Sequence, residues 1–191
     1  MFEQQIVKNC APTLAGLKTG NMFQYSYESR EELLTFIRRL NRQLAEKGIR
    51  VVPLRMSEKR ALLYLFRPKK LRHDLTHGSA ACLLRSRGYC PEHCGRCVAQ
   101  LGKKLRRQEA FPHEIGLFLG YPPEDVEGFI NQGAHRCKCT GCWKVYGDEE
   151  AAKKTFAQYK KCTKVYCDRW EQGTSLDRLT IKEKRPLTED R

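Results

Sequence analysis

Three of the ten cysteines stand within eight residues, in the stretch CPEHCGRC at 90–97, beside a histidine. Thiolates and imidazoles are the ligands that zinc prefers, and thiolates also hold iron–sulfur clusters. A continuous helix would separate Cys90 from Cys97 by about 10 Å along its axis, so another segment would have to complete the ligands of one ion. The candidates for this metal or thiol site are Cys90, His93, Cys94 and Cys97.

The same stretch allows two further interpretations. Pro91 is favoured at the first position of a helix, which would place Cys90 at the N-cap, where the helix dipole favours the thiolate. The following residues also form one helical stripe, in which cysteines act as small buried hydrophobes. The stripe consists of Cys94, Cys97, Val98, Leu101 and Leu105.

A second cluster, HRCKCTGC at 135–142, contains a C-x2-C pair with a glycine inside its turn. The glycine lets backbone amides approach both sulfurs, as in a zinc knuckle. Cys167 is left out, because it lies five residues after Cys162 on a predicted helix, about 140 degrees around the axis. Reduced thiols that line a core are the alternative. The predicted ligands of a zinc ion or an iron–sulfur cluster are Cys137, Cys139, Cys142 and Cys162.

The stretch CAPTLAGLKTGN at 10–21 combines small residues and glycines ahead of a predicted strand. Such a loop can bring its backbone close to a ligand or an anion. We predict a ligand-approach loop with Cys10, Lys18 and Thr19, and a tight structural turn is the alternative. The stretch lacks the spacing of a Walker loop.

The stretch FPHEIGLFLGYPPEDVEGFI predicts two short helices joined by an L-G-Y turn, and the hairpin at 112–131 is similar to a helix-turn-helix. Its second helix begins with acidic residues that would repel a nucleic-acid backbone, so we favour a packed helical hairpin. A nucleic-acid-binding regulator stays as an alternative function. His113 and Glu114 could act as an acid–base pair, although cap and dipole arrangements are commoner at a helix start.

Composition indicates which class of partner and which cellular compartment to expect. Thirty-six Lys and Arg residues against 22 Asp and Glu give a formal net charge of +14, which favours polyanions or acidic proteins as partners. The sequence has no signal-peptide pattern and no apolar run of about 20 residues. We therefore expect a cytoplasmic protein without membrane association, whose cysteines are thiols, metal ligands or redox groups.

The hydrophobic pattern predicts an α+β fold, with a small antiparallel sheet in an N-terminal β-α-β-β unit and a predominantly helical remainder. A capping box at Ser29 and Glu32 opens the first predicted helix. The predicted strands are 21–27, 49–54 and 61–66, and the predicted helices are 29–47, 71–77, 79–87, 91–108, 112–119, 123–131 and 148–170. We expect a single domain over 1–180, with the sheet part at about 10–68 and the helical cysteine-rich part at about 69–175, before a frayed tail at 181–191.

Three stretches carry a resemblance to a known family: CAPTLAGLKTGN, FPHEIGLFLGYPPEDVEGFI and CWKVYGDEEAAKKTFAQYKKCTKVY. Together they resemble the signature blocks of an uncharacterised bacterial family, domain of unknown function 3793, over about residues 9–180. Members are reputed to lie near flavodoxin genes, which implies a link to low-potential electron transfer or iron supply. The blocks include Cys10, Cys142, Cys162 and Cys167, whereas the stretch 90–97 lies outside them.

Our primary hypothesis is a cysteine-rich accessory protein that binds zinc or an iron–sulfur cluster and docks on an acidic redox partner such as flavodoxin. The nucleic-acid-binding alternative would show an affinity that falls steeply with salt. A thiol-dependent enzyme is the second alternative, with Cys10 or Cys90 as nucleophile and His93 or His113 as base. It would show one cysteine that alkylates far faster than the others.

Overall fold

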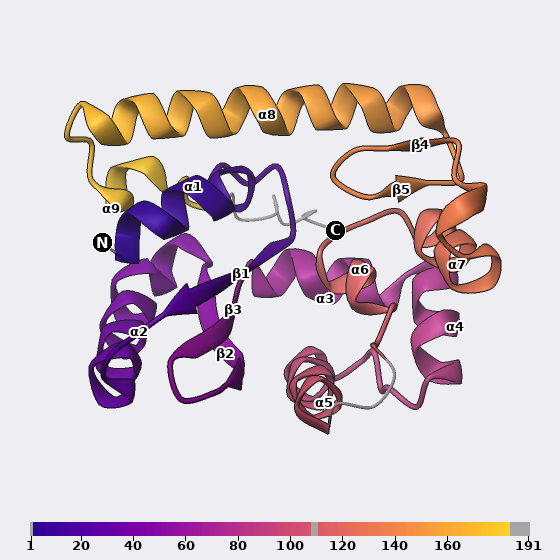
Figure 1. Cartoon of the computed structure of the whole chain (residues 1–191), viewed down its shortest axis with the longest axis horizontal. Coiled ribbons are helices and arrows are strands. Elements are labelled where there is room, and N and C mark those ends of the chain that lie inside the picture. The colour runs from indigo at the N-terminus through magenta and orange to yellow at the C-terminus, as the bar shows by residue number, and fades with distance from the viewer. Residues whose placement is uncertain (1, 108–110, 184–191) are drawn as a thin grey trace, which may run out of the picture.

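The computed structural model describes residues 2–107 and 111–183 (Figure 1). Its first part comprises α1 (Phe2–Leu14), β1 (Gly20–Ser26), α2 (Arg30–Leu44), the 3-10 helix η1 (Ala45–Lys47), β2 (Arg50–Met56) and β3 (Arg60–Phe66). The three strands form an antiparallel sheet of order β1-β3-β2, in which Gly20 and Arg50 both pair with Phe66. The predicted β-α-β-β unit and the α+β fold class are confirmed.

The remainder is mostly helical. It comprises α3 (Pro68–Thr76), α4 (Gly78–Ser86), α5 (Cys94–Arg107), α6 (Ile115–Phe118), α7 (Pro123–Gln132), η2 (Ala134–Arg136), the hairpin strands β4 (Cys139–Thr140) and β5 (Lys144–Val145), α8 (Glu149–Glu171) and α9 (Leu176–Leu179). Helix α8 runs along one long edge of the molecule, from the hairpin to α9, and it packs on α1 (Figure 1). No helix in the described ranges is both long enough and apolar enough to cross a bilayer.

The sheet is the middle layer between two hydrophobic cores, because side chains alternate between the two faces of a strand. In β3, Leu63 and Leu65 face the core built with α1 and α2. Tyr64 and Phe66 face the core built with α3, α4 and α5. A central strand that is buried on both faces explains the continuous apolar run at 61–66, which has no polar alternation.

Two predicted helix starts are confirmed by their caps. The hydroxyl of Ser29 accepts a hydrogen bond from the backbone N–H of Glu32 at 3.2 Å, and a carboxylate oxygen of Asp148 accepts one from Ala151 at 3.0 Å. Each cap satisfies an N–H group that has no partner inside its own helix.

Two sequence predictions about helices were wrong. Cys90 is not an N-cap, because 90–93 form a turn, closed by the His93 N–H on the Cys90 carbonyl at 3.0 Å, and α5 begins only at Cys94. The stretch that begins at Cys10 is not a loop throughout, because α1 continues to Leu14. A proline in the last turn of α1 and the glycines beyond it concealed this helix. The end of the predicted tail, 184–191, lies outside the described residues.

Arg67 joins three remote segments to the end of the central strand. Its side chain is 2% exposed, and its guanidinium donates to the carbonyls of Thr13 and Leu14 at 2.8 Å each. It also donates to the carbonyls of Lys47 at 3.1 Å and Ile181 at 2.8 Å. The last carbonyls of a helix have no partner inside the helix, so Arg67 completes the hydrogen bonding at the end of α1.

Replacing Arg67 should therefore cost much of the stability. We expect Arg67→Met to lower the free energy of unfolding by about 3 kcal/mol or more, because buried carbonyls lose charged donors. Arg67→Lys should fall between Arg67→Met and the wild type, since an ammonium replaces only part of the guanidinium fork. Urea denaturation followed by circular dichroism measures both.

The matched control is Arg60→Met at the exposed start of β3, which we expect to change stability by less than about 0.5 kcal/mol. An Arg67→Met protein as stable as the Arg60→Met protein would contradict this account of Arg67.

Candidate functional site

The predicted metal ligands of the second cluster lie on two separate elements. A Cβ atom added at Gly141 would lie 2.2 Å from the ring of Phe156, so the turn of the hairpin packs against this part of α8. Cys162 lies six residues further along α8, which is about 9 Å of helix rise. Within the described ranges, no group of three or more His, Cys, Asp or Glu side chains is arranged to hold a metal ion. Coordination by Cys137, Cys139, Cys142 and Cys162 stays a prediction, and it would require the hairpin to move.

The stretch at 90–97 divides between core and surface. Cys94 and Cys97 are buried on the core face of α5, while Cys90 and His93 are exposed. Burial raises the pKa of both buried thiols, that of Cys97 to about 11, and the Cys97 thiol donates to the Cys90 carbonyl at 3.0 Å. These two cysteines pack as small apolar side chains, and a metal or thiol site at this place also stays a prediction.

The predicted ligand-approach loop is partly helical. Cys10 lies in α1 with no exposed surface, and burial raises the pKa of its thiol far above the usual range. A thiol in this position is a poor nucleophile, because the thiolate is the reactive form. Lys18 and Thr19 follow α1, and both line a cavity of about 360 Å³.

Four segments remote in sequence form this cavity, which we call the Lys18 cavity. Loop residues before β1, helix α3 with the residue after it, the α6–α7 connection and α8 each contribute to its walls. Its polar and aromatic lining residues are Lys18, Thr19, Lys70, His73, Asp74, His77, Tyr121 and Tyr159. The sequence pointed only to Lys18 and Thr19, because no local spacing links the other six. All three stretches that carry the family resemblance nevertheless meet here.

The Lys18 side chain is largely buried, and it has no ionic partner among the described residues. The residue is 6% exposed, and its Nζ atom lies 5.2 Å from the ring centroid of Tyr121 and 5.8 Å from that of Tyr159. Among the described residues, Nζ of Lys18 has no hydrogen-bond acceptor and no carboxylate at ion-pair distance. The two aromatic faces offer only a weak attraction to an ammonium compared with a carboxylate.

Burial lowers the pKa of Lys18 to about 8, although the nearby thiols of Cys142 and Cys10 act in the opposite direction. The neighbouring groups titrate later. Burial raises the pKa of Tyr121 and of Tyr159 to about 12, and it also raises that of Cys142. Lys18 is therefore the group of this cluster whose charge changes first as the pH rises from neutrality.

Helix α3 lines the cavity with further polar groups. The Lys70 ammonium donates to the carbonyls of Gly16 and Leu17 at 3.2 Å each, which fixes it beside the loop that carries Lys18. The Thr19 hydroxyl donates to a carboxylate oxygen of Asp74, so that the nearest acidic group is already engaged. The cavity therefore holds two amines and one occupied carboxylate.

Two imidazoles stand at the edge of the same cavity. The rings of His73 and His77 are stacked with their centroids 4.2 Å apart, and a ring nitrogen of His77 lies 2.7 Å from the His73 carbonyl. His73 is 71% exposed at its side chain, so this pair lies on the solvent side of the cavity.

The wall of the cavity that contains Tyr121 is held in place by the buried carboxylate of Asp125. One oxygen of Asp125 accepts from the Trp143 indole at 2.6 Å, and Trp143 stacks on Tyr121 with ring centroids 4.8 Å apart. Gly120 brings this wall against the loop: its φ is +73°, and a Cβ atom there would lie 2.7 Å from the hydroxyl oxygen of Thr19. Only glycine allows this approach.

The burial of Asp125 also changes the interpretation of the acidic residues at the start of α7. The sequence suggested three acidic side chains at its solvent-facing start, but Asp125 is 3% exposed and bound to Trp143 and to the N–H groups of Tyr146 and Gly147. The helical hairpin of α6 and α7 is packed, as the sequence interpretation favoured. Nucleic-acid binding stays an untested alternative.

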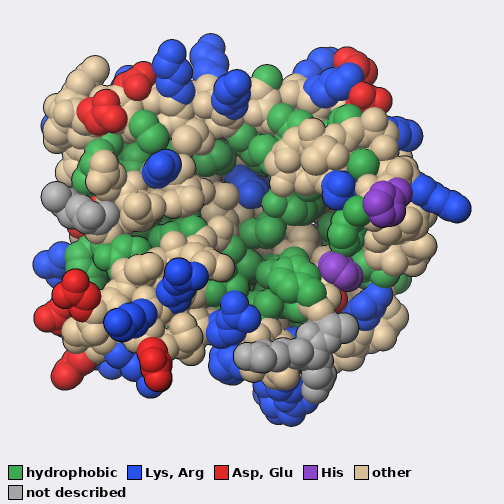
Figure 2. Space-filling model, in the orientation of Figure 1, with side chains coloured by type: hydrophobic (Ala, Val, Ile, Leu, Met, Phe, Trp, Pro, Cys, Tyr) green, Lys and Arg blue, Asp and Glu red, His purple; other side chains and the backbone are tan. Residues whose placement is uncertain are grey.

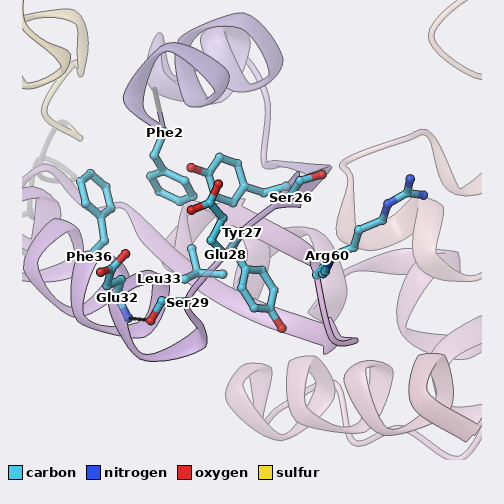
Figure 3. A pocket seen from close by; sticks show the side chains of 11 residues that line it. Phe2, Ser26, Tyr27, Glu28, Ser29, Glu32, Leu33, Phe36 and Arg60 are labelled. Atoms are coloured by element: carbon cyan, nitrogen blue, oxygen red, sulfur yellow. Dashed lines mark hydrogen bonds between the residues drawn. The ribbon is translucent and has the colours of Figure 1, made fainter.

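A larger groove of about 980 Å³ lies at the other end of the sheet, between α1, the end of β1 and the start of α2. Figure 3 shows Phe2 and Phe36 side by side in its wall, where their rings pack edge to face with centroids 4.7 Å apart. Two of its polar groups serve the fold: Ser29 caps α2, and the Tyr27 hydroxyl donates to the Ser57 carbonyl. Size alone therefore does not make this groove the better candidate.

His113 and Glu114 are not an acid–base pair. Glu114 is 1% exposed, and one of its oxygens accepts from Lys104 at 2.8 Å and from the Tyr89 hydroxyl at 3.0 Å. Lys104 is the main cause of the lowered pKa of this carboxyl group, against the effect of its burial. Glu114 joins α5 to the start of α6, while His113 is exposed and packs against Phe129.

Comparison with known proteins identifies the family of the chain but assigns no activity to it. The sequence matches the protein family of unknown function DUF3793 over residues 6–180. No curated protein and no solved structure matches the chain. Because the match covers nearly the whole chain, this cysteine-rich protein belongs to the DUF3793 family.

Proposed function

We propose that the protein binds a small anion, with a carboxylate or phosphate group, in the Lys18 cavity. The observation that carries this proposal is that Lys18, a largely buried lysine, lines the cavity and has no ionic partner among the described residues. A buried ammonium without a counterion is costly to the fold, and an anionic ligand would supply the missing partner.

The surroundings favour an anion over a cation. Lys70 adds a second positive charge, so among the lining residues two lysines outnumber one acid, Asp74, whose carboxylate accepts from the Thr19 hydroxyl. The net charge of +14 also raises the local concentration of anions. Lys and Arg side chains are spread around the margin of the face in Figure 2, which is hollowed in its middle.

Lys18→Met should stabilise the protein and weaken anion binding. At neutral pH we expect the variant to gain roughly 2 kcal/mol in free energy of unfolding, because it no longer buries an unpaired charge. We expect its affinity for phosphate or glycolate to fall by about tenfold or more, because a charged contact is lost. Urea denaturation and titration calorimetry measure the two effects.

Lys160→Met, at an exposed position of α8, is the matched control and should change neither quantity appreciably. A Lys18→Met protein that binds both anions as tightly as the wild type does would refute the proposed site.

The affinity for glycolate should depend on pH through Lys18. Above the pKa of about 8, the free protein loses the Lys18 proton, so affinity should fall about tenfold per pH unit. Titration calorimetry from about pH 7 to about pH 9.5 measures this slope. Cys142→Ser is the control for the neighbouring thiol: because Cys142 raises the pKa of Lys18, this variant should keep the wild-type slope with its midpoint at a slightly lower pH. A flat wild-type profile would contradict the role of the Lys18 charge.

Stability should show the opposite trend. Between about pH 8 and the usual lysine value near pH 10.4, the unfolded chain holds a proton that the native state has lost. The unfolded state then binds more protons, so the stability of the wild type should rise with pH relative to Lys18→Met. The advantage of the variant should therefore shrink across this window, as urea denaturation at several pH values will show.

Metal binding and docking on an acidic redox partner such as flavodoxin form a second proposal. Ten cysteines within one chain support the first part. Several exposed lysines along α8 support the second, because they offer a positive surface to an acidic protein. These lysines are Lys153, Lys154, Lys160, Lys161 and Lys164.

A zinc ion or an iron–sulfur cluster on the predicted ligands should be detectable after purification without oxygen, through zinc, iron and sulfide per chain. Cys139→Ser and Cys142→Ser should then lower the melting temperature, because metal binding contributes folding energy. Cys82→Ser, at an exposed position of α4, is the control. Metal-free protein whose melting temperature is unchanged in both variants would end this proposal and leave anion binding unaffected.

A further inference from the structure

We propose that Lys18 captures an anion that carries an aldehyde or ketone carbon beside its charged group, by forming an imine with that carbon. This inference rests on the proposed anion site and specifies the class of ligand that the site takes. α-Keto acids and aldehyde acids belong to this class.

The first argument is that the Lys18 nitrogen is free to act as a nucleophile. An amine attacks a carbonyl only through its lone pair, and a carboxylate partner would hold that lone pair as an ammonium. Among the described residues, Nζ lies near the aromatic faces of Tyr121 and Tyr159 and has no carboxylate at ion-pair distance. An aromatic face stabilises an ammonium less than a carboxylate does, so burial lowers the pKa of Lys18 and the neutral amine forms at a lower pH than in an exposed lysine.

The second argument is the presence of two amines with different surroundings in one cavity. The Lys70 ammonium is held by the carbonyls of Gly16 and Leu17, so it supplies a fixed positive charge for the anionic group of the ligand. Lys18 is buried deeper and has no such acceptors. Desolvation is one condition that activates a lysine for imine formation, and burial is the main cause of the lowered pKa of Lys18.

The reaction needs no partner beyond the ligand. The lone pair of Nζ forms a bond to the carbonyl carbon, and the carbonyl electron pair moves to oxygen, which takes a proton to give a carbinolamine. The hydroxyl group then leaves as water while nitrogen and carbon form a double bond, so amine and carbonyl give imine and water. His77 lines the cavity on its solvent side and can carry the proton to the departing oxygen.

The test uses glyoxylate with borohydride on the wild-type protein. Reduction of the imine leaves a carboxymethyl group on the lysine nitrogen, and peptide mass spectrometry after proteolysis reports its amount at each lysine. We expect Lys18 to be modified about tenfold or more faster than exposed lysines such as Lys160, although it is far less accessible. The comparison is made within one protein, so it depends on no variant that could fail to fold.

Two further measurements separate this inference from the proposed anion site. Lys18→Arg keeps the charge and removes the nucleophile, so it should bind glycolate, which lacks the carbonyl, and form no adduct at position 18. If glycolate binds the wild type and Lys18 is labelled no faster than Lys160, the imine is overturned and anion binding stands. If glycolate also fails to bind, both proposals are overturned together.

Discussion

The hydrogen bonds of the Arg67 guanidinium hold together segments that are far apart in the sequence. The guanidinium stands at the end of the central strand and donates to carbonyls of α1, of η1 and of the segment after α9. The Arg67 N–H also donates to the Thr19 carbonyl at 2.9 Å. One residue thus closes the end of α1 and fixes the loop from which Lys18 enters its cavity. Charged donors on neutral carbonyls give this join its strength without a buried ion pair.

Lys18 is the opposite kind of residue, because it weakens the fold that Arg67 strengthens. Its side chain is largely buried, yet its amine lies over two tyrosine rings and has no ionic partner among the described residues. The wall beside Lys18 is fixed by packing, since Asp125 orients Trp143 and Trp143 stacks on Tyr121. A rigid wall around an unpaired charge is the arrangement expected of a binding site, where a missing partner is supplied by the ligand.

The cysteines take several physical roles in one chain. Cys10 and Cys97 have no exposed surface and act as small apolar side chains, whereas Cys82, Cys90 and Cys142 are exposed. Spacing in sequence could not separate these roles, because cysteine suits both a core stripe and a ligand set. Burial separates them, since it opposes the thiolate that metal binding and nucleophilic attack require.

Periodicity and capping act between near neighbours, so the β-α-β-β unit, the capped starts of α2 and α8, and the buried stripe of α5 could be predicted from the sequence. The sequence also pointed to Lys18 and Thr19. Helix α1, the true start of α5 and the Lys18 cavity were decided only by tertiary structure. The walls of that cavity come from residues as far apart as Lys18 and Tyr159, and the burial of an amine depends on which of these remote segments pack around it.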